Sequence, residues 1–81
     1  MSKLAYKINF LSTQAEEGSA DRLVFTDALS VLTLQAGHAP LISILQNGGF
    51  VVTDAGESKS YTYQSGLVRV EGRRCVVTIL S

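Results

Sequence analysis

Apolar and polar residues alternate along Lys3 to Phe10, and this period of two constrains the fold more than any other feature of the sequence. Leu4, Tyr6, Ile8 and Phe10 occupy every second position of that stretch. Because successive side chains of a β-strand point to opposite sides, the pattern predicts a strand with one buried face.

Further short runs rich in β-branched residues or leucine follow, and they have the length of strands. They cover residues 22–26, 31–35, 41–45, 50–53, 60–64, 67–71 and 75–80. Asn47-Gly48-Gly49 predicts a tight hairpin turn, because Asn and Gly tolerate positive φ, and Asp54 to Glu57 and Glu71 to Arg74 predict two more hairpin tips. Ser12 to Ala20 is expected to form a loop or one helical turn.

Short strands with a turn signal roughly every ten residues indicate an all-β fold. We expect a small flattened β-sandwich or barrel of about 8–10 short, mostly antiparallel strands, without a C-terminal helical hairpin. The chain is expected to form a single domain over residues 1–81. Two of the runs depart from alternation: 75–80 is apolar on both faces, and 41–45 nearly so. Such strands are either buried on both sides or show one face to a partner.

Composition excludes several classes of function. The 7 basic and 7 acidic residues cancel, and no basic cluster exceeds Arg73-Arg74, which argues against nucleic acid as a partner. Cys75 is the single cysteine, so the sequence predicts neither a disulfide framework nor a cysteine-based zinc site. With no apolar run as long as a membrane span and no signal peptide, we expect a soluble, intracellular protein.

The stretch QAGHAPLISIL, residues 35–45, holds the one histidine and the one proline of the chain. Pairing His38 with Cys75 as base and nucleophile is disfavoured, because Cys75 lies in an apolar strand where a thiolate is costly. A single histidine also cannot supply the three or four convergent ligands of a metal site. Two interpretations remain: an ordinary glycine-proline turn, or an edge that presents His38 and the apolar residues after it to another protein.

The motif V-L-x-x-x-G-H-A-P-L-I, Val31 to Ile42, is similar to the hallmark of the epsilon subunit of the rotary ATP synthase, in its N-terminal β-sandwich domain. An opening strand that runs into Ser12-Thr13 resembles the first strand of that family. Asn47 to Val52 matches its N-G-x-V segment, and Ser65 to Val70 with Val77 to Leu80 resembles its closing strands. The resemblance covers nearly the whole chain.

The resemblance implies a non-catalytic rotor subunit without cofactor or metal. It would hold the gamma subunit with one face and edge, rest on the membrane c-ring, and couple proton flow to ATP synthesis without inserting into lipid. Implied gamma contacts are Ser12, His38, Leu41, Ile42 and Ser43. Implied contacts with the ring are Asp27, Ser30 and Val31. The implied location is the cytoplasmic face of the bacterial cell membrane.

Two departures from the family pattern bear on these expectations. The approach to the motif, Phe25 to His38, lacks three glycines and a glutamate that the family usually has, so Val31 stands at the acidic ring-contact position and Asp27 is a substitute for it. Family members typically continue into two C-terminal helices that bind ATP and act as a brake, whereas this sequence ends at Ser81. If the chain is a natural short form, the resemblance implies that it couples but does not inhibit; a piece of a longer member would have the same sequence.

Two alternative functions stay open on the sequence. A stand-alone β-sandwich module for protein or small-ligand binding would use a pocket lined by Tyr6, Tyr61 and Tyr63, although tyrosines at alternate positions are typical of cross-strand packing. A hydrolase using His38 lacks an evident nucleophile.

Overall fold

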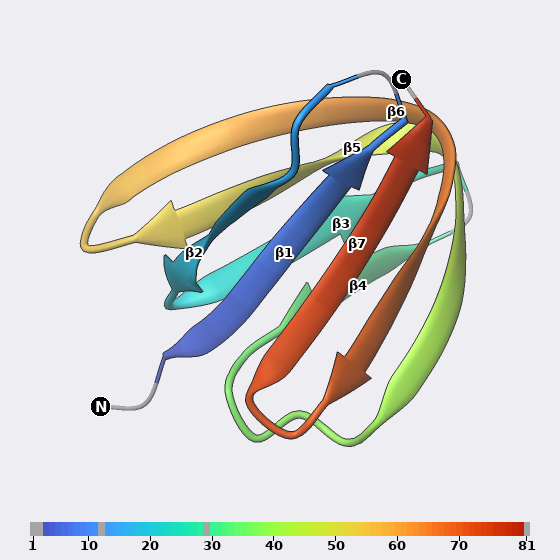
Figure 1. The fold of residues 1–81 in the computed structure, drawn as a ribbon. Helices are drawn as coiled ribbons and strands as arrows, with labels where there is room; N and C mark the ends of the chain where they lie inside the picture. Colours follow the sequence, from blue (N-terminus) through green and yellow to red (C-terminus); the bar gives the residue numbers. More distant parts are fainter. Residues whose placement is uncertain (1–2, 12, 29, 81) are drawn as a thin grey trace.

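A computed structural model describes residues 3–11, 13–28 and 30–80. Its seven strands are β1 (Leu4–Phe10), β2 (Glu16–Ala20), β3 (Arg22–Thr26), β4 (Val31–Leu34), β5 (Leu41–Asp54), β6 (Glu57–Glu71) and β7 (Arg74–Leu80). The described residues contain no helix, and hence none that could cross a membrane. The predicted all-β class is confirmed (Figure 1).

The strands form one sheet in the order β2-β1-β7-β6-β5-β3-β4, and this sheet curls over on itself (Figure 1). β1 and β7 pair in parallel, while all other neighbours are antiparallel. The long hairpin of β5 and β6 belongs to both halves of the curled sheet. We call β2, β1, β7, residues 65–71 of β6 and residues 41–46 of β5 the front layer. The back layer consists of residues 57–63 of β6, residues 48–54 of β5, β3 and β4.

The predicted hairpin turn at Asn47-Gly48-Gly49 is wrong, because these residues lie inside β5. They form the bend between the two layers, and Asn47 adopts a positive φ of 45°. A Cβ atom on Gly48 would overlap the carbonyl oxygen of Thr26, and one on Gly49 would lie 2.7 Å from the carbonyl oxygen of Tyr61. The glycines are thus required by close backbone approach at a bend, and not by a chain reversal.

The bend also explains why the sequence predicts four short strands where the structure has two long ones. Inward-facing positions are odd before the bend of β5, as at Leu45, and even after it, as at Phe50 and Val52. In β6 the buried positions likewise change from Tyr63 to Val68 and Val70. A change of phase in the alternation looks like the end of a strand, although the backbone pairing continues.

β2 is the second correction, since Ser12 to Ala20 was expected to be a loop or helical turn. Residues Glu16–Ala20 pair with Leu4 to Ile8 of β1. Of its side chains only that of Ala20 is buried, so the strand carries no alternating pattern. The hairpin tips predicted at Asp54 to Glu57 and Glu71 to Arg74 are confirmed.

The core between the layers is apolar and holds a row of aromatic rings. Phe25 stacks on Phe50 with ring centroids 4.8 Å apart, and Phe50 stacks on Tyr61 at 4.9 Å. Phe10 of the front layer meets Tyr61 at 6.1 Å, so the row crosses from one layer to the other. Such pairs add favourable ring contacts to the burial of large apolar surfaces, and they tie the layers together.

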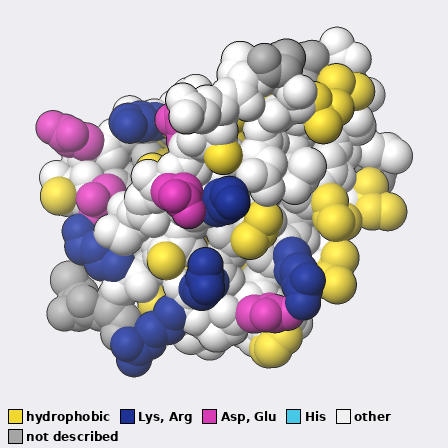
Figure 2. All heavy atoms as spheres, viewed as in Figure 1, with side chains coloured by type: hydrophobic (Ala, Val, Ile, Leu, Met, Phe, Trp, Pro, Cys, Tyr) yellow, Lys and Arg dark blue, Asp and Glu magenta, His cyan; other side chains and the backbone are white. Residues whose placement is uncertain are grey.

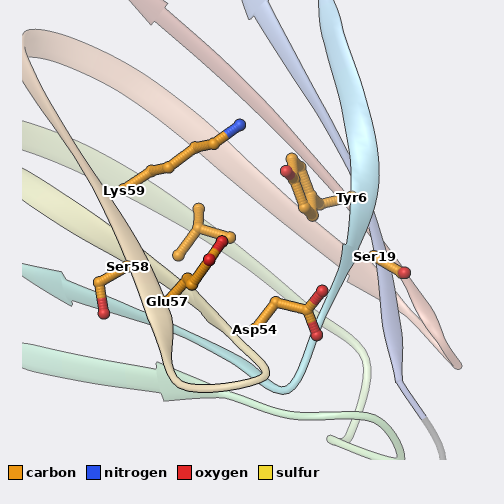
Figure 3. A pocket seen from close by; sticks show the side chains of 7 residues that line it. Tyr6, Ser19, Asp54, Glu57, Ser58 and Lys59 are labelled. Carbon is orange, nitrogen blue, oxygen red and sulfur yellow. The ribbon is translucent and has the colours of Figure 1, made fainter.

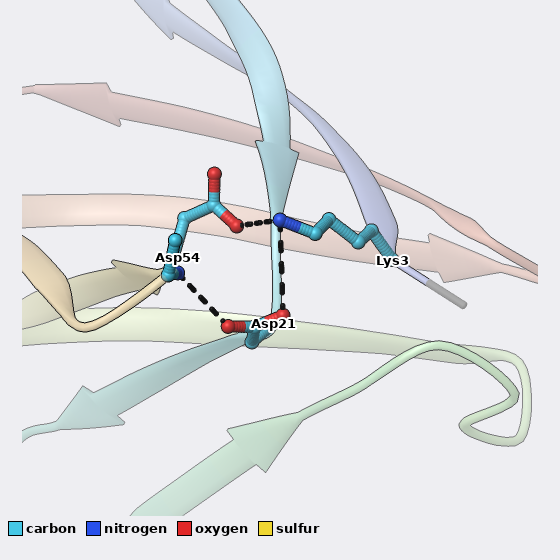
Figure 4. A network of polar contacts seen from close by, with 4 residues as sticks. Lys3, Asp21 and Asp54 are labelled. Atoms are coloured by element: carbon cyan, nitrogen blue, oxygen red, sulfur yellow. Dashed lines mark hydrogen bonds and ion pairs between the residues drawn. The ribbon is translucent and has the colours of Figure 1, made fainter. Parts of the chain in front are cut away.

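A polar network joins the start of β1, the corner between β2 and β3, and the tip of the β5–β6 hairpin (Figure 4). The Lys3 ammonium donates to the Asp54 carboxylate and lies 4.0 Å from Asp21 Oδ1. Asp21 Oδ2 in turn accepts a hydrogen bond from the Ala55 N–H at 3.0 Å. The hydrogen bond to Asp54 is the largest of the causes that raise the pKa of Lys3 above its ordinary value. All of these groups are solvent-accessible, so the network orients the tip more than it stabilises the fold.

Candidate docking surface

The outer face of the front layer carries a group of exposed aliphatic side chains, which we call the apolar surface. Its members are Leu11 (71% exposed), Ile42 (67%), Ile44 (71%), Leu67 (42%) and Leu80 (44%). Figure 2 shows hydrophobic side chains gathered along the right-hand side of the molecule, where β5 and β6 run. A contiguous exposed group of this kind is typical of a surface that contacts another protein.

The strand register explains why these side chains lie together. Ile44 of β5 is opposite Leu67 of β6, which in turn is opposite Thr78 of β7. Ile42, two residues before Ile44, points to the same face. Leu11, Leu67 and Leu80 line a shallow groove of about 330 Å³ along β6 and β7. The apolar surface therefore spans the three neighbouring strands β5, β6 and β7 of the front layer.

Charged side chains border the apolar surface on one side. Arg69 stands opposite Ile42 and forms an ion pair with Glu71 on its own strand. Arg69 is also opposite Val76 of β7, which in turn is opposite Lys7 of β1, so these residues form one row across the strands. Because the Arg69–Glu71 pair is exposed, it adds little stability. These charges form a polar rim along one side of the apolar surface, and a polar rim beside an apolar centre is common in protein interfaces.

The structure separates the residues expected to face gamma. Ile42 lies on the apolar surface, whereas Leu41 is half-buried and packs against the core. Ser43 is also half-buried, on the same side of the strand as Leu41. Ser12 lies outside the described residues. The sequence reading missed Ile44, Leu67, Leu80 and Leu11, although the alternation of Leu41 to Leu45 would have grouped Ile44 with Ile42.

His38 lies in the turn between β4 and β5 and is half-buried. Its Nδ1 is 2.7 Å from the carbonyl oxygen of Ala39, and its backbone N–H donates to the carbonyl oxygen of Gln35 at 3.1 Å. Gly37, which precedes it, has a φ of 87°. The glycine therefore permits a strained turn that the histidine ring stabilises, in line with the structural interpretation of this motif.

Cys75 is fully buried on the inner side of β7, and burial raises the pKa of its thiol to about 11. A thiol with a raised pKa is a poor nucleophile at neutral pH. Among residues 3–11, 13–28 and 30–80, no three His, Cys, Asp or Glu side chains come together as a metal site would require.

Asp27, Ser30 and Val31 come together at the turn from β3 to β4. Asp27 Oδ1 accepts a hydrogen bond from the Ser30 N–H at 3.1 Å, and the Asp27 N–H donates to the Ser30 carbonyl oxygen at 3.1 Å. Val31 is 65% exposed, on the edge strand β4. Val31 thus presents an apolar side chain to solvent beside this turn.

The three tyrosines do not line a common pocket. Tyr63 is buried. Tyr61 packs in the aromatic row and donates to Glu16 Oε1 at 3.0 Å, and burial is the main reason that its pKa rises to about 12. Of the three tyrosines, only Tyr6 lines the cavity of about 570 Å³ drawn in Figure 3. The rest of its lining comes from β2 and from the β5–β6 hairpin near its tip. The structure thus gives no support to a tyrosine-walled ligand site.

Comparisons with known proteins bear on the fold. No family model and no curated protein sequence matches this chain. A chain in the mitochondrial ATP synthase central stalk and c-ring structure of Tetrahymena thermophila is similar, with a TM-score of 0.79 and 15% identity over 99% of this chain and 65% of that one. A chain of the Euglena gracilis mitochondrial ATP synthase is similar with a TM-score of 0.87 and 12% identity, over 98% of this chain and 51% of that one.

The protein therefore has the fold of chains found in these ATP synthase structures, and it spans about two thirds and one half of their lengths. At such low identity the likeness shows the fold alone. Which partners the protein binds depends on the side chains on its own surface.

Proposed function

We propose that the protein is a non-catalytic central-stalk subunit of a rotary ATP synthase, of the epsilon type, and that it docks on the gamma subunit through the apolar surface. It would act as a peripheral protein at the cytoplasmic face of a bacterial membrane, as one sandwich domain over residues 1–81. The observation that carries the proposal is the combination of a stalk-like fold with an exposed, rimmed apolar surface on one layer.

The size of the contact favours the whole outer face as the docking area. A stable protein interface buries roughly 800 Å² on each partner. A chain with a total accessible surface of 5098 Å² reaches that area only by committing most of one layer and an edge. Leu67 lies on β6, the middle one of the three strands that carry the apolar surface, where truncation usually costs the most binding energy.

The turn from Asp27 to Val31 is the proposed contact with the membrane c-ring. It ends in an exposed valine and contains one carboxylate, whose oxygen binds the Ser30 N–H. In this proposal the sandwich acts as a rigid connector: its packed core transmits torque from the ring to gamma without a chemical step.

The test is co-purification of this chain with the gamma subunit from the same source, followed by calorimetric titration of the pair. We expect one-to-one binding with a Kd below about 1 μM. Absence of binding, under conditions in which a standard epsilon subunit binds its own gamma, would reject the proposal.

A further inference from the structure

The first half of β5 is a free edge of the front layer. Residues Leu41 to Gln46 pair with β6 on one side. β3, which covers the other side of β5 in the back layer, pairs only with residues 49–53. Within the part of the chain that the structure describes, no strand pairs with the outer side of Leu41 to Gln46. Half of the backbone N–H and C=O groups in such a segment therefore point away from the sheet.

Each layer has two edges, and they differ in charge. β2 carries Glu16 and Glu17, and the first half of β6 carries Glu57 and Lys59. β4 and the first half of β5 carry none, since residues 28–53 contain no Asp, Glu, Lys or Arg. Proteins commonly protect a free strand edge with charged side chains, so an uncharged edge is suited to pairing with another chain.

Of the two uncharged edges, only that of β5 is continuous with the apolar surface. Ile42 and Ile44 belong to the edge strand itself and stand beside Leu67 on the next strand. A groove of about 350 Å³ lies between the start of β5 and the end of β6, lined by Pro40, Leu41, Ile42, Arg69, Val70 and Glu71. β4 has a single exposed aliphatic side chain, Val31, and only four residues. A protein seated on the apolar surface therefore reaches the β5 edge directly.

Both ends of the β5 edge are defined by backbone chemistry. Pro40 has no N–H and cannot continue a ladder toward the N-terminus. Asn47, with a φ of 45°, begins the bend that turns the strand into the back layer. Between them lie six residues, which at roughly 3.3 Å per residue offer an edge of about 20 Å.

We propose that the protein bound to the apolar surface adds an extended, uncharged strand to residues 41–46 of β5. The inference rests on the proposed function and specifies how gamma is held. Backbone hydrogen bonds along the edge supply part of the affinity, and side chains at alternate positions of the added strand cover Ile42 and Ile44.

The test is amide hydrogen exchange by NMR on the free chain and on its complex with gamma. Alternate amides of Leu41 to Gln46, which exchange rapidly in the free chain, are expected to slow by at least about tenfold in the complex. The amides of Val31 to Leu34 in β4 serve as the matched uncharged edge, and their exchange is expected to stay the same.

The outcomes separate this inference from the proposed function. If gamma binds and Leu67→Asp abolishes binding, but the β5 amides remain fast, strand addition is wrong and docking stands. If the β5 amides are slow in the free chain and become faster on dilution, a second copy of this chain occupies the edge and the inference is overturned. If gamma does not bind at all, both proposals fall.

Discussion

The two outer faces of the sandwich are built by the same hairpin, yet they differ in character. On the front layer β5 and β6 expose Ile42, Ile44 and Leu67, whereas on the back layer β6 exposes Ser60 and Thr62. Both faces consist of regular strands, so propensity for strand structure does not explain the contrast. Among the described residues, the back face combines polar side chains with one large exposed aliphatic side chain, Val31, whereas the front face groups five of them, which is typical of a surface that another protein covers.

The largest expected effect comes from placing a carboxylate at the centre of the apolar surface. Leu67→Asp should raise the Kd for gamma at least about a hundredfold, because an unpaired charge buried in an interface costs several kcal/mol. Thr62→Asp, an exposed change on the other half of the same strand, is the matched control and should leave the Kd within about threefold. Calorimetric titration measures both, and equal effects would remove the distinction between the faces.

The bend that separates the faces can be tested through stability. Gly48→Ala should lower the free energy of unfolding by about 3 kcal/mol, because a Cβ there meets the Thr26 carbonyl oxygen and the Asp27 backbone. Gly37→Ala has open space but a positive φ, and should cost about 1 kcal/mol. Urea unfolding gives both values, and a neutral Gly48→Ala would show that the two layers adjust freely at the bend.

The aromatic row between the layers predicts a loss of stability at alkaline pH. Burial raises the Tyr61 pKa from 10.0 to about 12, so the folded protein holds that proton over a range where the unfolded chain releases it. The contribution is therefore complete below pH 10 and is lost as the pH rises toward about 12. Tyr61→Phe removes the titrating group, and its stability, measured by denaturant unfolding from pH 9 upward, should fall less steeply than that of the unchanged protein. Parallel slopes would exclude Tyr61 as the cause.

The smallest effect is expected at the edge of the front face. His38→Ala should change the Kd for gamma by less than about threefold, because its ring binds a carbonyl oxygen of its own turn. Ile42→Asp, on the apolar surface, should weaken binding about a hundredfold. Calorimetric titration of the two variants side by side gives the ratio of their Kd values for gamma. Similar losses of affinity would place His38 at the centre of the contact.

Much of the fold was predictable from residue patterns. Alternation in Lys3 to Phe10 predicted β1, short apolar runs predicted β3, β4 and β7, and Gly with Asp, Glu and Arg predicted the two hairpin tips. These features depend on local geometry, since a strand with one buried face must alternate and a tight turn needs residues that accept its φ. The motif around His38 predicted a turn for the same reason.

Tertiary structure alone decided the rest. β2 exists because the exposed edge of β1 pairs with it, although its side chains bury almost nothing. Asn47 to Gly49 became a bend because the backbones of Thr26 and Tyr61 approach them closely. Ile44 and Leu67 became a surface because the chain folds its second layer behind them and leaves the front uncovered. The sequence by itself determined the strands that have an alternating or apolar pattern, such as β1, β3, β4 and β7. The strand β2, the bend within β5 and the face that stays open depended on contacts between residues far apart along the chain.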